Sequence, residues 1–186
     1  NFVGSLESAT GKELWQRIDS EILEAIGEND KAQTPRKGFS SSSYVKADDD
    51  AIYFAGPQRT NLVAISAATG DLLWKHPHGN YQLILREDGV YAMGRTETSK
   101  KFDRTSGEIL ADLQCFRGNC TRATATVDSI FTRGYRHTGT QRIRLDDQQV
   151  ITSRIGLMRP ACQDGVVVAH GQLYWGPWMC DCNLSL

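Results

Sequence analysis

The chain has 186 residues, enough for one domain with a hydrophobic core, so its length alone excludes no class of protein. Its 21 basic and 22 acidic side chains nearly cancel, which disfavours a surface built for nucleic acid or anionic lipid. No apolar run approaches the roughly 18 residues of a membrane span, and the first residues lack a signal-peptide pattern. The start at Asn1 and an end inside an apparent strand suggest a mature fragment of a longer polypeptide.

One sequence pattern occurs twice along the chain and a third time in a weaker form. Residues 6–15 match residues 65–74, each with Thr-Gly followed by Leu-Trp, and residues 102–111 are the weaker copy. The pattern predicts an apolar strand, a turn in which glycine adopts a positive φ angle, and a strand whose Trp packs between neighbouring sheets. The two Trp residues are therefore expected at equivalent buried positions. The residues with this structural role are Gly11, Trp15, Gly70, Trp74 and Gly107.

The spacing of these glycines predicts units of four strands. Gly70 and Gly107 are 37 residues apart, close to the length of about 40 residues expected for one propeller blade. Further short strands recur in the same order along the chain. The predicted division is a partial blade at 1–18, an inter-blade loop at 19–42, blades at 43–78, 79–113 and 114–153, and a partial blade at 154–186.

The inserted segment 19–42 explains the longer distance of 59 residues between Gly11 and Gly70. Its start, at 21–26, can form a short helical turn. The polar stretch that follows contains Pro and Ser, and it favours a mobile surface loop.

The Thr-Gly-x-x-Leu-Trp element resembles the tryptophan-docking repeat of the PQQ-like β-propeller superfamily. That superfamily includes quinoprotein alcohol dehydrogenases and non-enzymatic outer-membrane assembly lipoproteins, and it commonly has seven or eight blades. The resemblance implies an all-β propeller of four-stranded antiparallel blades, of which this chain supplies about four. Residues 119–126, 159–165 and 174–182 also resemble the C-terminal propeller region of secreted, multidomain planctomycete-type bacterial proteins, which implies a periplasmic or secreted location.

The residues of a quinoprotein active site are missing from this sequence. Such sites resemble one another in an adjacent Cys pair, a Trp floor and a calcium ion held by acidic and amide groups, and no two Cys residues are adjacent here. The run 48–50 (Asp-Asp-Asp) offers oxygen ligands for Ca²⁺, but it directly precedes a strand and is better explained as a solvated turn. We therefore expect no catalytic residues, no PQQ and no bound metal in this segment.

Five cysteines are the most reactive side chains of the chain. In an extracytoplasmic protein they are expected to form disulfides that stabilise long loops, with one thiol left over. The expected pairs are Cys162 with Cys180 or Cys182, and Cys115 with Cys120. The alternative is a soft-metal site built from Cys162, Cys180 and Cys182 with Cys120 or His170, although Cys-x-Cys departs from zinc-knuckle spacing.

Four arginines lie close together in the third predicted blade, with acidic residues nearby. Because alternate strand positions face opposite sides of a sheet, we interpret them as a solvated sheet surface rather than an anion site. They are Arg133, Arg136, Arg142 and Arg144.

Three functions are compatible with these features. The first is an extracytoplasmic scaffold or binding module that is not itself an enzyme. The second is part of a quinoprotein or haem-linked oxidoreductase whose cofactor residues lie outside this chain. The third is a carbohydrate- or polymer-binding propeller in which Trp175 and Trp178 stack on sugar rings.

The two ends of the chain supply complementary strands. Residues 2–18 are the closing two strands of one blade, and residues 161–186 begin another. They pair either with each other in a small ring or with further sequence in a larger ring, and we expect the larger ring. The expected partner is a protein, or the remainder of a longer polypeptide that completes the propeller.

Overall fold

The computed structural model describes residues 1–27, 44–57, 59–118, 121–135, 139–146, 150–152, 158, 160 and 165–176. Within these residues the chain forms one short helix and sixteen strands, all paired with antiparallel neighbours. The helix α1 covers Ser20–Ile26. No helix in the described part of the chain is both long and apolar enough to cross a membrane.

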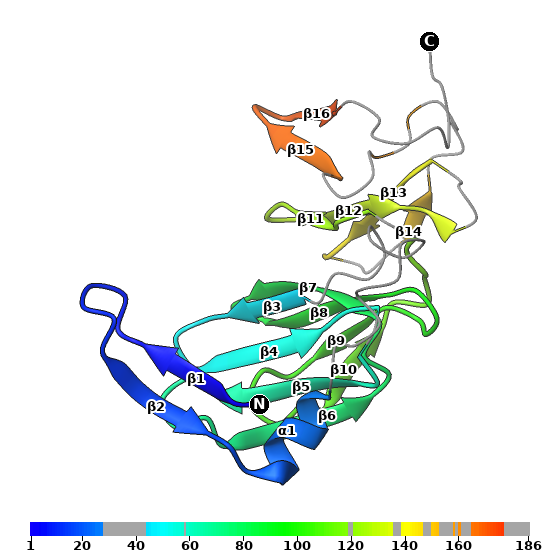
Figure 1. Cartoon of the computed structure of the whole chain (residues 1–186). Helices are drawn as coiled ribbons and strands as arrows, with labels where there is room; N and C mark the ends of the chain where they lie inside the picture. The colour runs from blue at the N-terminus through cyan, green and yellow to red at the C-terminus, as the bar shows by residue number, and fades with distance from the viewer. Residues whose placement is uncertain are drawn as a thin grey trace, which may run out of the picture.

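The strands form five separate antiparallel sheets that follow one another in chain order (Figure 1). Two strands form the amino-terminal pair, β1 (Val3–Leu6) and β2 (Glu13–Arg17). Sheet 1 contains β3 (Tyr44–Ala47), β4 (Ala51–Ala55), β5 (Asn61–Ser66) and β6 (Leu72–Pro77). Sheet 2 contains β7 (Tyr81–Arg86), β8 (Gly89–Gly94), β9 (Lys100–Phe102) and β10 (Ile109–Asp112).

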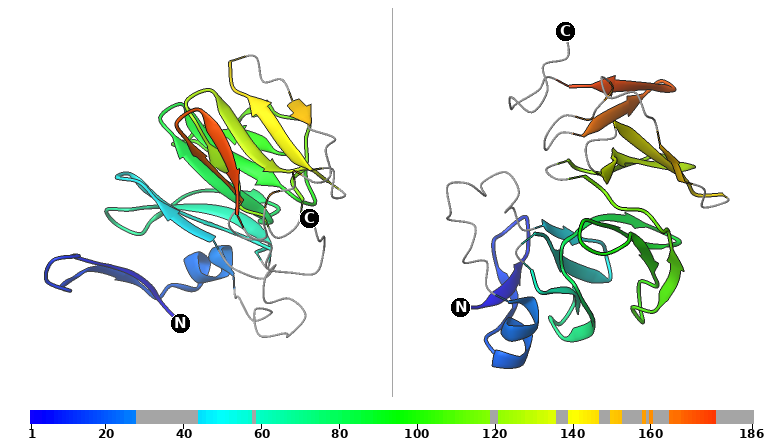
Figure 2. Two further views of the ribbon diagram at one scale, coloured as in Figure 1. Left: turned by 90° about the horizontal axis from the view of Figure 1, so that it is seen from above. Right: turned by 90° about the vertical axis from the view of Figure 1, so that its right-hand side faces the viewer.

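Sheet 3 repeats this order of strands, and a second two-stranded sheet follows it. Sheet 3 contains β11 (Thr124–Ala125), β12 (Ser129–Arg133), β13 (Thr140–Arg144) and β14 (Val150–Thr152). The carboxy-terminal pair consists of β15 (Val166–Ala169) and β16 (Gln172–Trp175). The amino-terminal and carboxy-terminal pairs lie at opposite ends of the row of sheets (Figures 1 and 2).

The central strands are apolar on both faces because each complete sheet lies between two neighbours. Every residue of β8 is buried, and so are the four central residues of β5. A strand covered on one face only would alternate apolar and polar residues, whereas these strands form almost continuous apolar runs. The main cores therefore lie between successive sheets.

An indole joins the amino-terminal pair to sheet 1, and a second joins sheet 1 to sheet 2. Trp15 donates its Nε1–H to the Ala67 carbonyl at 2.8 Å, and a Cβ atom on Gly70 would lie only 2.6 Å from its ring. Gly70 also has a φ angle of 75°, so both the turn and the close approach favour glycine.

The junction between sheets 1 and 2 repeats this arrangement. Trp74 donates to the Arg104 carbonyl at 3.0 Å, and a Cβ atom on Gly107 would lie 2.5 Å from the indole. Trp74 is buried and stacks on Phe102, with ring centroids 5.8 Å apart. Trp15 is half-buried in the matching position.

The junction between sheets 2 and 3 has a different construction. Ala111 stands where the repeat would place a Trp, and its side chain packs at the edge of an apolar cluster. Arg86 connects the sheets instead, because its guanidinium donates to the Thr126 carbonyl at 2.7 Å and to the Val127 carbonyl at 2.9 Å. The apolar cluster contains Ile84, Tyr91, Met93, Leu113, Cys115, Ile130 and Ile143.

The start of the segment 19–42 is a helix, as its sequence allowed, and this helix is packed on sheet 1. Ile22, Ala25 and Ile26 lie on one face of α1 and are buried against sheet 1. Arg59 donates to the Ile26 carbonyl at 2.6 Å, and Asn61 donates to the Ala25 carbonyl at 3.3 Å. The apolar spacing of three and four residues outweighs the polar sequence that follows it. Residues 28–43 lie outside the described part of the chain.

Candidate functional site

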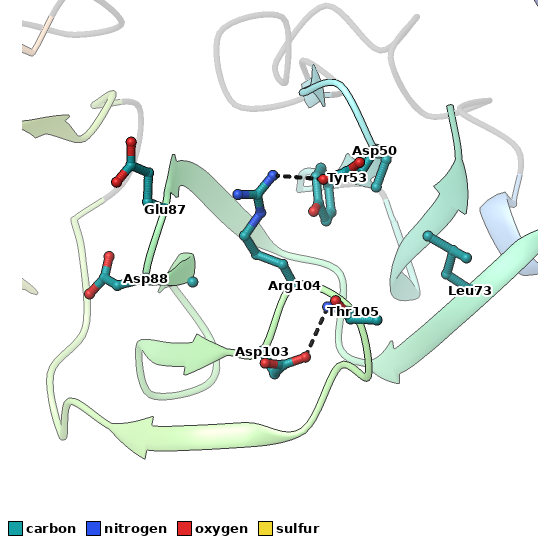
Figure 3. Close-up of a pocket in the computed structure, with 10 residues that line it drawn as sticks. Asp50, Tyr53, Leu73, Glu87, Asp88, Asp103, Arg104 and Thr105 are labelled. Carbon is teal, nitrogen blue, oxygen red and sulfur yellow. Dashed lines mark hydrogen bonds and ion pairs between the residues drawn. The ribbon is translucent and has the colours of Figure 1, made fainter. Parts of the chain in front are cut away.

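The candidate site is a groove of about 550 Å³ between sheets 1 and 2, at the edge where their turns gather (Figure 3). Its lining comes from the turn after β3, from β4 and β6, and from the β7–β8 and β9–β10 turns. Four carboxylates and one guanidinium line it together with small and apolar groups. The lining residues are Asp50, Ala51, Tyr53, Leu73, Glu87, Asp88, Gly89, Asp103, Arg104 and Thr105.

Asp48 holds the sheet 1 side of the groove in place. Its carboxylate accepts hydrogen bonds from the backbone amides of Asp50 at 3.0 Å and Ala51 at 2.9 Å, which fixes the turn into β4. The Tyr53 hydroxyl donates to the same carboxylate at 3.3 Å. Burial raises the pKa of Asp48. The hydrogen bonds from the two amides and the charge of Arg104 together lower it by more, so its pKa lies below the ordinary value.

Arg104 crosses from sheet 2 to sheet 1 and closes one side of the groove. Its guanidinium lies 2.8 Å from an Asp48 carboxylate oxygen and 3.6 Å from an Asp50 oxygen. Figure 3 shows it pointing toward Asp50 and Tyr53. A hydrogen bond with Tyr53 is the main cause of its raised pKa. Because its backbone carbonyl also accepts the Trp74 indole N–H, the packing of the Trp positions this charge.

Asp88 is the most strongly held carboxylate on the sheet 2 side. It accepts hydrogen bonds from Tyr91 Oη at 2.7 Å and Lys101 Nζ at 2.8 Å, and from Arg86 Nε at 3.2 Å. Partial burial raises its pKa, but the bonds from Lys101, Tyr91 and Arg86 outweigh burial and lower the pKa to about 2. Asp88 is therefore an anion at neutral pH.

The remaining carboxylates differ in how much of their charge is already compensated. Asp103 accepts from the backbone amides of Ser106 and Thr105, which lower its pKa and leave it ionised. Glu87 and Asp50 are exposed at the rim, and Asp50 reaches Arg104 only at the longer distance given above. The groove therefore presents negative charge at its rim together with the exposed apolar side chain of Leu73.

This arrangement is suited to holding a cationic group. None of the ten lining residues is Ser, Cys, His or Lys, so the lining does not contain a Ser–His or Cys–His pair. No group of three His, Cys, Asp or Glu residues in the described part of the chain has the geometry for a metal ion. In the run 48–50, Asp48 fixes a turn and forms ion pairs with Arg104.

The structure changes the interpretation of Cys115. Its thiol is free and buried in the apolar cluster between sheets 2 and 3, and burial raises its pKa. The expected bridge from Cys115 to Cys120 is therefore not formed in this structure, because the apolar interior takes up the thiol. Cys120, Cys162, Cys180 and Cys182 lie outside the described residues, so the other expected pairing stays a prediction.

The arginines of sheet 3 are not all on a solvated surface, which corrects that interpretation. Arg133 is buried, with its aliphatic stem against Gly118. Arg142 forms an ion pair with Asp128 at 3.4 Å and donates to Ser129 Oγ at 2.8 Å. Arg144 forms an exposed pair with Asp146, and Arg136 lies outside the described residues.

Trp175 is held between the carboxy-terminal pair and sheet 3. Its indole N–H donates to Thr140 Oγ1 at 2.9 Å, and the side chain is partly buried. Trp178 lies outside the described residues.

Of the groove residues, the sequence singled out Asp50 alone, as part of the acidic run 48–50. The charged side chains of the groove come from separate turns, and only the fold brings them together. One signal was available: Asp48, Asp88 and Asp128 each occupy the turn between the first and second strands of a sheet. Each accepts a hydrogen bond from a nearby residue of its own sheet.

Comparisons with known proteins identify the architecture. No family model matches the chain, and no curated protein does. Among solved structures, BamB from Moraxella catarrhalis superposes with a TM-score of 0.58 at 18% identity, over 88% of this chain and 46% of that chain. The computationally designed Ika8 protein superposes with a TM-score of 0.58 at 13% identity, over 80% of this chain and 41% of that chain.

The chain has a β-propeller fold. The expected all-β architecture of four-stranded antiparallel blades is confirmed by the three complete sheets and by these superpositions. At such low identity the likeness extends to the propeller fold alone. The chain spans less than half the length of each of these two solved structures.

Proposed function

We propose that the chain is a non-catalytic propeller scaffold that binds a partner protein, and that the groove between sheets 1 and 2 receives a basic side chain of that partner. The observation that carries this proposal is the unequal charge of the groove, which has four carboxylates and one guanidinium. The guanidinium of Arg104 lies closest to Asp48, which is not one of these four carboxylates, and reaches Asp50 only at 3.6 Å, so it offsets the negative rim only in part.

Physical arguments favour a lysine or arginine side chain in this groove. A concave surface lined by charges of one sign concentrates counter-ions in it. The volume of about 550 Å³ falls in the range of pockets that hold small ligands, so it has room for a side chain and its neighbours. Leu73, which is 43% exposed, supplies apolar area for the aliphatic stem, and the exposed carboxylates of Glu87 and Asp50 are available to its charged end.

Titration with a fluorescein-labelled hexalysine peptide tests this function, with labelled hexaglutamate as the reference. We expect hexalysine alone to bind, with an affinity that falls as salt is added. Glu87→Lys and Asp50→Lys should each weaken binding roughly 2- to 10-fold, since a rim ion pair contributes about 0.2–1 kcal/mol and reversal adds repulsion.

Glu24→Lys is the matched control, because it reverses an exposed carboxylate on α1, outside the groove. It should leave the affinity nearly unchanged. An equal loss in all three variants would mean that the peptide responds to net charge, and the groove would then have no special role.

We further propose that the chain is extracytoplasmic. This rests on its resemblance to periplasmic and secreted PQQ-like propellers, including those of planctomycete-type bacteria, and on its five cysteines. Non-reducing peptide mapping tests the remaining disulfide prediction. A bridge from Cys162 to Cys180 or Cys182 is expected, and free thiols at all three positions would contradict it.

We also propose that this segment binds no PQQ. The support is the absence of an adjacent Cys pair from the whole sequence. Incubation with PQQ and Ca²⁺ followed by desalting should leave a protein without quinone absorbance. Retention of the quinone in equal molar amount would favour the alternative of an oxidoreductase.

A further inference from the structure

The carboxy-terminal pair exposes a tyrosine side chain whose counterparts in sheets 1 and 2 are buried. Tyr53 in β4 and Tyr91 in β8 lie in the second strand of their sheets, and the following sheet covers them to 0% and 1% exposure. Tyr174 occupies the matching place in β16 and is 48% exposed. Val167, its partner across the strands, is 58% exposed. In the part of the chain that the structure describes, one face of this pair therefore has no sheet against it.

The amino-terminal pair exposes the opposite kind of face. Leu6 occupies the repeat position of Ile65 and Phe102, which are both fully buried by the preceding elements, yet Leu6 is 63% exposed. An added Cβ at Gly11 would meet nothing within 4 Å, whereas its counterparts Gly70 and Gly107 are covered by indoles. Here the missing element is a preceding sheet.

The strands of the two pairs are complementary. β1 and β2 correspond to the third and fourth strands of a sheet, and β15 and β16 correspond to the first and second. If β16 meets β1 as β4 meets β5, where Tyr53 lies opposite Ala64, then Tyr174 lies opposite Ser5. The two pairs of one chain lie at opposite ends of the row, so they do not meet each other (Figure 2).

Sheet 1 also has room for a carboxy-terminal pair against its first strand. In the described residues β7 lies against β3, and β15 lies against β11, so first strands of successive sheets pack side by side. Among the described residues, no such strand covers the other face of β3, where Val45 is 57% exposed although its cross-strand partner Phe54 is buried. A hairpin placed there would bury Val45, Val167 and Tyr174 together.

We propose that two copies of this chain close one propeller ring. The carboxy-terminal pair of each copy joins the amino-terminal pair of the other, which forms two composite four-stranded sheets. Three complete sheets and one composite sheet per copy make a ring of eight. The chain matches 46% and 41% of two solved propellers, so two copies supply about the length of one. The composite sheets also pair β1 and β16, whose outer edges have no strand partner in the described residues.

The mass of the chain in solution tests this inference directly. Light scattering during gel filtration should give twice the 20.7 kDa of one chain. Leu6→Asp and Tyr174→Asp should each give monomers, because each places a carboxylate in a composite interface. Leu110→Asp is the control, since Leu110 is 52% exposed within the row, and it should remain a dimer. Circular dichroism should show that all three variants keep their strands.

Mixing the two monomeric variants tests the head-to-tail arrangement. One composite sheet in the mixed dimer contains only unaltered faces, so the mixture should recover dimers that neither variant forms alone. A monomeric wild-type chain, or a dimer that both substitutions leave intact, would overturn the proposal. So would a mixture without dimers, or a monomer whose β1 and β16 amides resist hydrogen exchange, which indicates closure within one chain.

The inference is independent of the groove, which lies between two sheets of the same copy. If the monomeric variants still bind hexalysine, the proposed function survives whatever the outcome for the ring. If the chain is a dimer but binds no basic peptide, only the proposed function fails.

Discussion

The junction between sheets 1 and 2 and the junction between sheets 2 and 3 perform the same task with different side chains. The first packs the Trp74 indole on Gly107 and adds one hydrogen bond to the Arg104 carbonyl. The second has Ala111 in place of the Trp and relies on the Arg86 guanidinium, which reaches two carbonyls of sheet 3. The Trp74 indole thus holds one pair of successive sheets together, and the Arg86 guanidinium, here called the charged strap, holds the next pair together. The two junctions should respond differently to mutation, to added volume and to pH.

Removal of the Trp74 side chain should change the free energy of unfolding more than any other substitution at the two junctions. Trp74→Ala should lower the free energy of unfolding by about 3–5 kcal/mol, because it removes a buried ring and leaves a cavity between two sheets. Trp15→Ala should cost less, since Trp15 is only half-buried. Urea unfolding measures both values, and Leu73→Ala, a change in the neighbouring exposed residue, is the control. Equal losses for Trp74→Ala and Leu73→Ala would contradict the role of the indole.

The glycine under the indole should tolerate no side chain. Gly107→Ala and Gly11→Ala both put Ala at a φ angle of 72°, which costs about 1–2 kcal/mol. Only the Gly107 variant also forces a Cβ atom to within 2.5 Å of a Trp, which should add about 1–3 kcal/mol. Unfolding at concentrations that keep the chain monomeric measures the difference between the two. A difference near zero would mean that Trp74 moves aside without loss.

The Trp-containing junctions are also the part of the fold that the sequence predicts best. An indole and a glycine must stand at fixed positions to make this contact, so the contact leaves a repeat that can be recognised in residues 65–74. The junction at Arg86 leaves no such trace, because carbonyl acceptors belong to every residue type. Sheet 3 was accordingly predicted from its strand pattern alone.

The groove and the helix α1 were harder to predict for two other reasons. Glu87, Asp103 and Arg104 come from two separate turns, and their proximity depends on how two sheets pack. For α1 the sequence shows the helical spacing of Ile22, Ala25 and Ile26. A segment of seven residues is nevertheless too short for helix propensity alone to determine whether a helix forms. Its stability comes from packing on sheet 1, which a single sequence does not display.

The charged strap should be weaker than the indole. Arg86→Met keeps most of the aliphatic stem but removes the hydrogen bonds to Thr126 and Val127, so we expect a loss of about 1–3 kcal/mol. Lys75→Met, a change at an exposed position on β6, is the matched control and should have little effect. Hydrogen exchange should show faster opening of sheet 3 in the Arg86 variant. An unchanged exchange rate there would show that the apolar cluster alone holds the two sheets.

The smallest effect should be the sensitivity to acid of the junction at Arg86, because Asp88 holds Arg86 in place. The pKa of Asp88 is about 2 in the folded chain, below its ordinary value of 3.8, so its contribution to stability is complete above about pH 4. That contribution disappears as the pH falls toward 2. Asp88 is half-exposed, and solvent screening limits the contribution to about 1 kcal/mol or less.

Urea unfolding across this pH range should show the stability advantage of the wild type over Asp88→Asn shrinking between pH 4 and 2. Lys101→Met should reduce the stability of the wild type above about pH 4, since Lys101 donates to Asp88, and this loss should shrink as the pH falls toward 2; in the Asp88→Asn background it should have little effect. The loss caused by Trp74→Ala should stay constant over the same range, because no titrating group takes part in the indole contact. If wild type and Asp88→Asn instead lose stability in parallel down to pH 2, Asp88 does not supply the acid sensitivity of this junction.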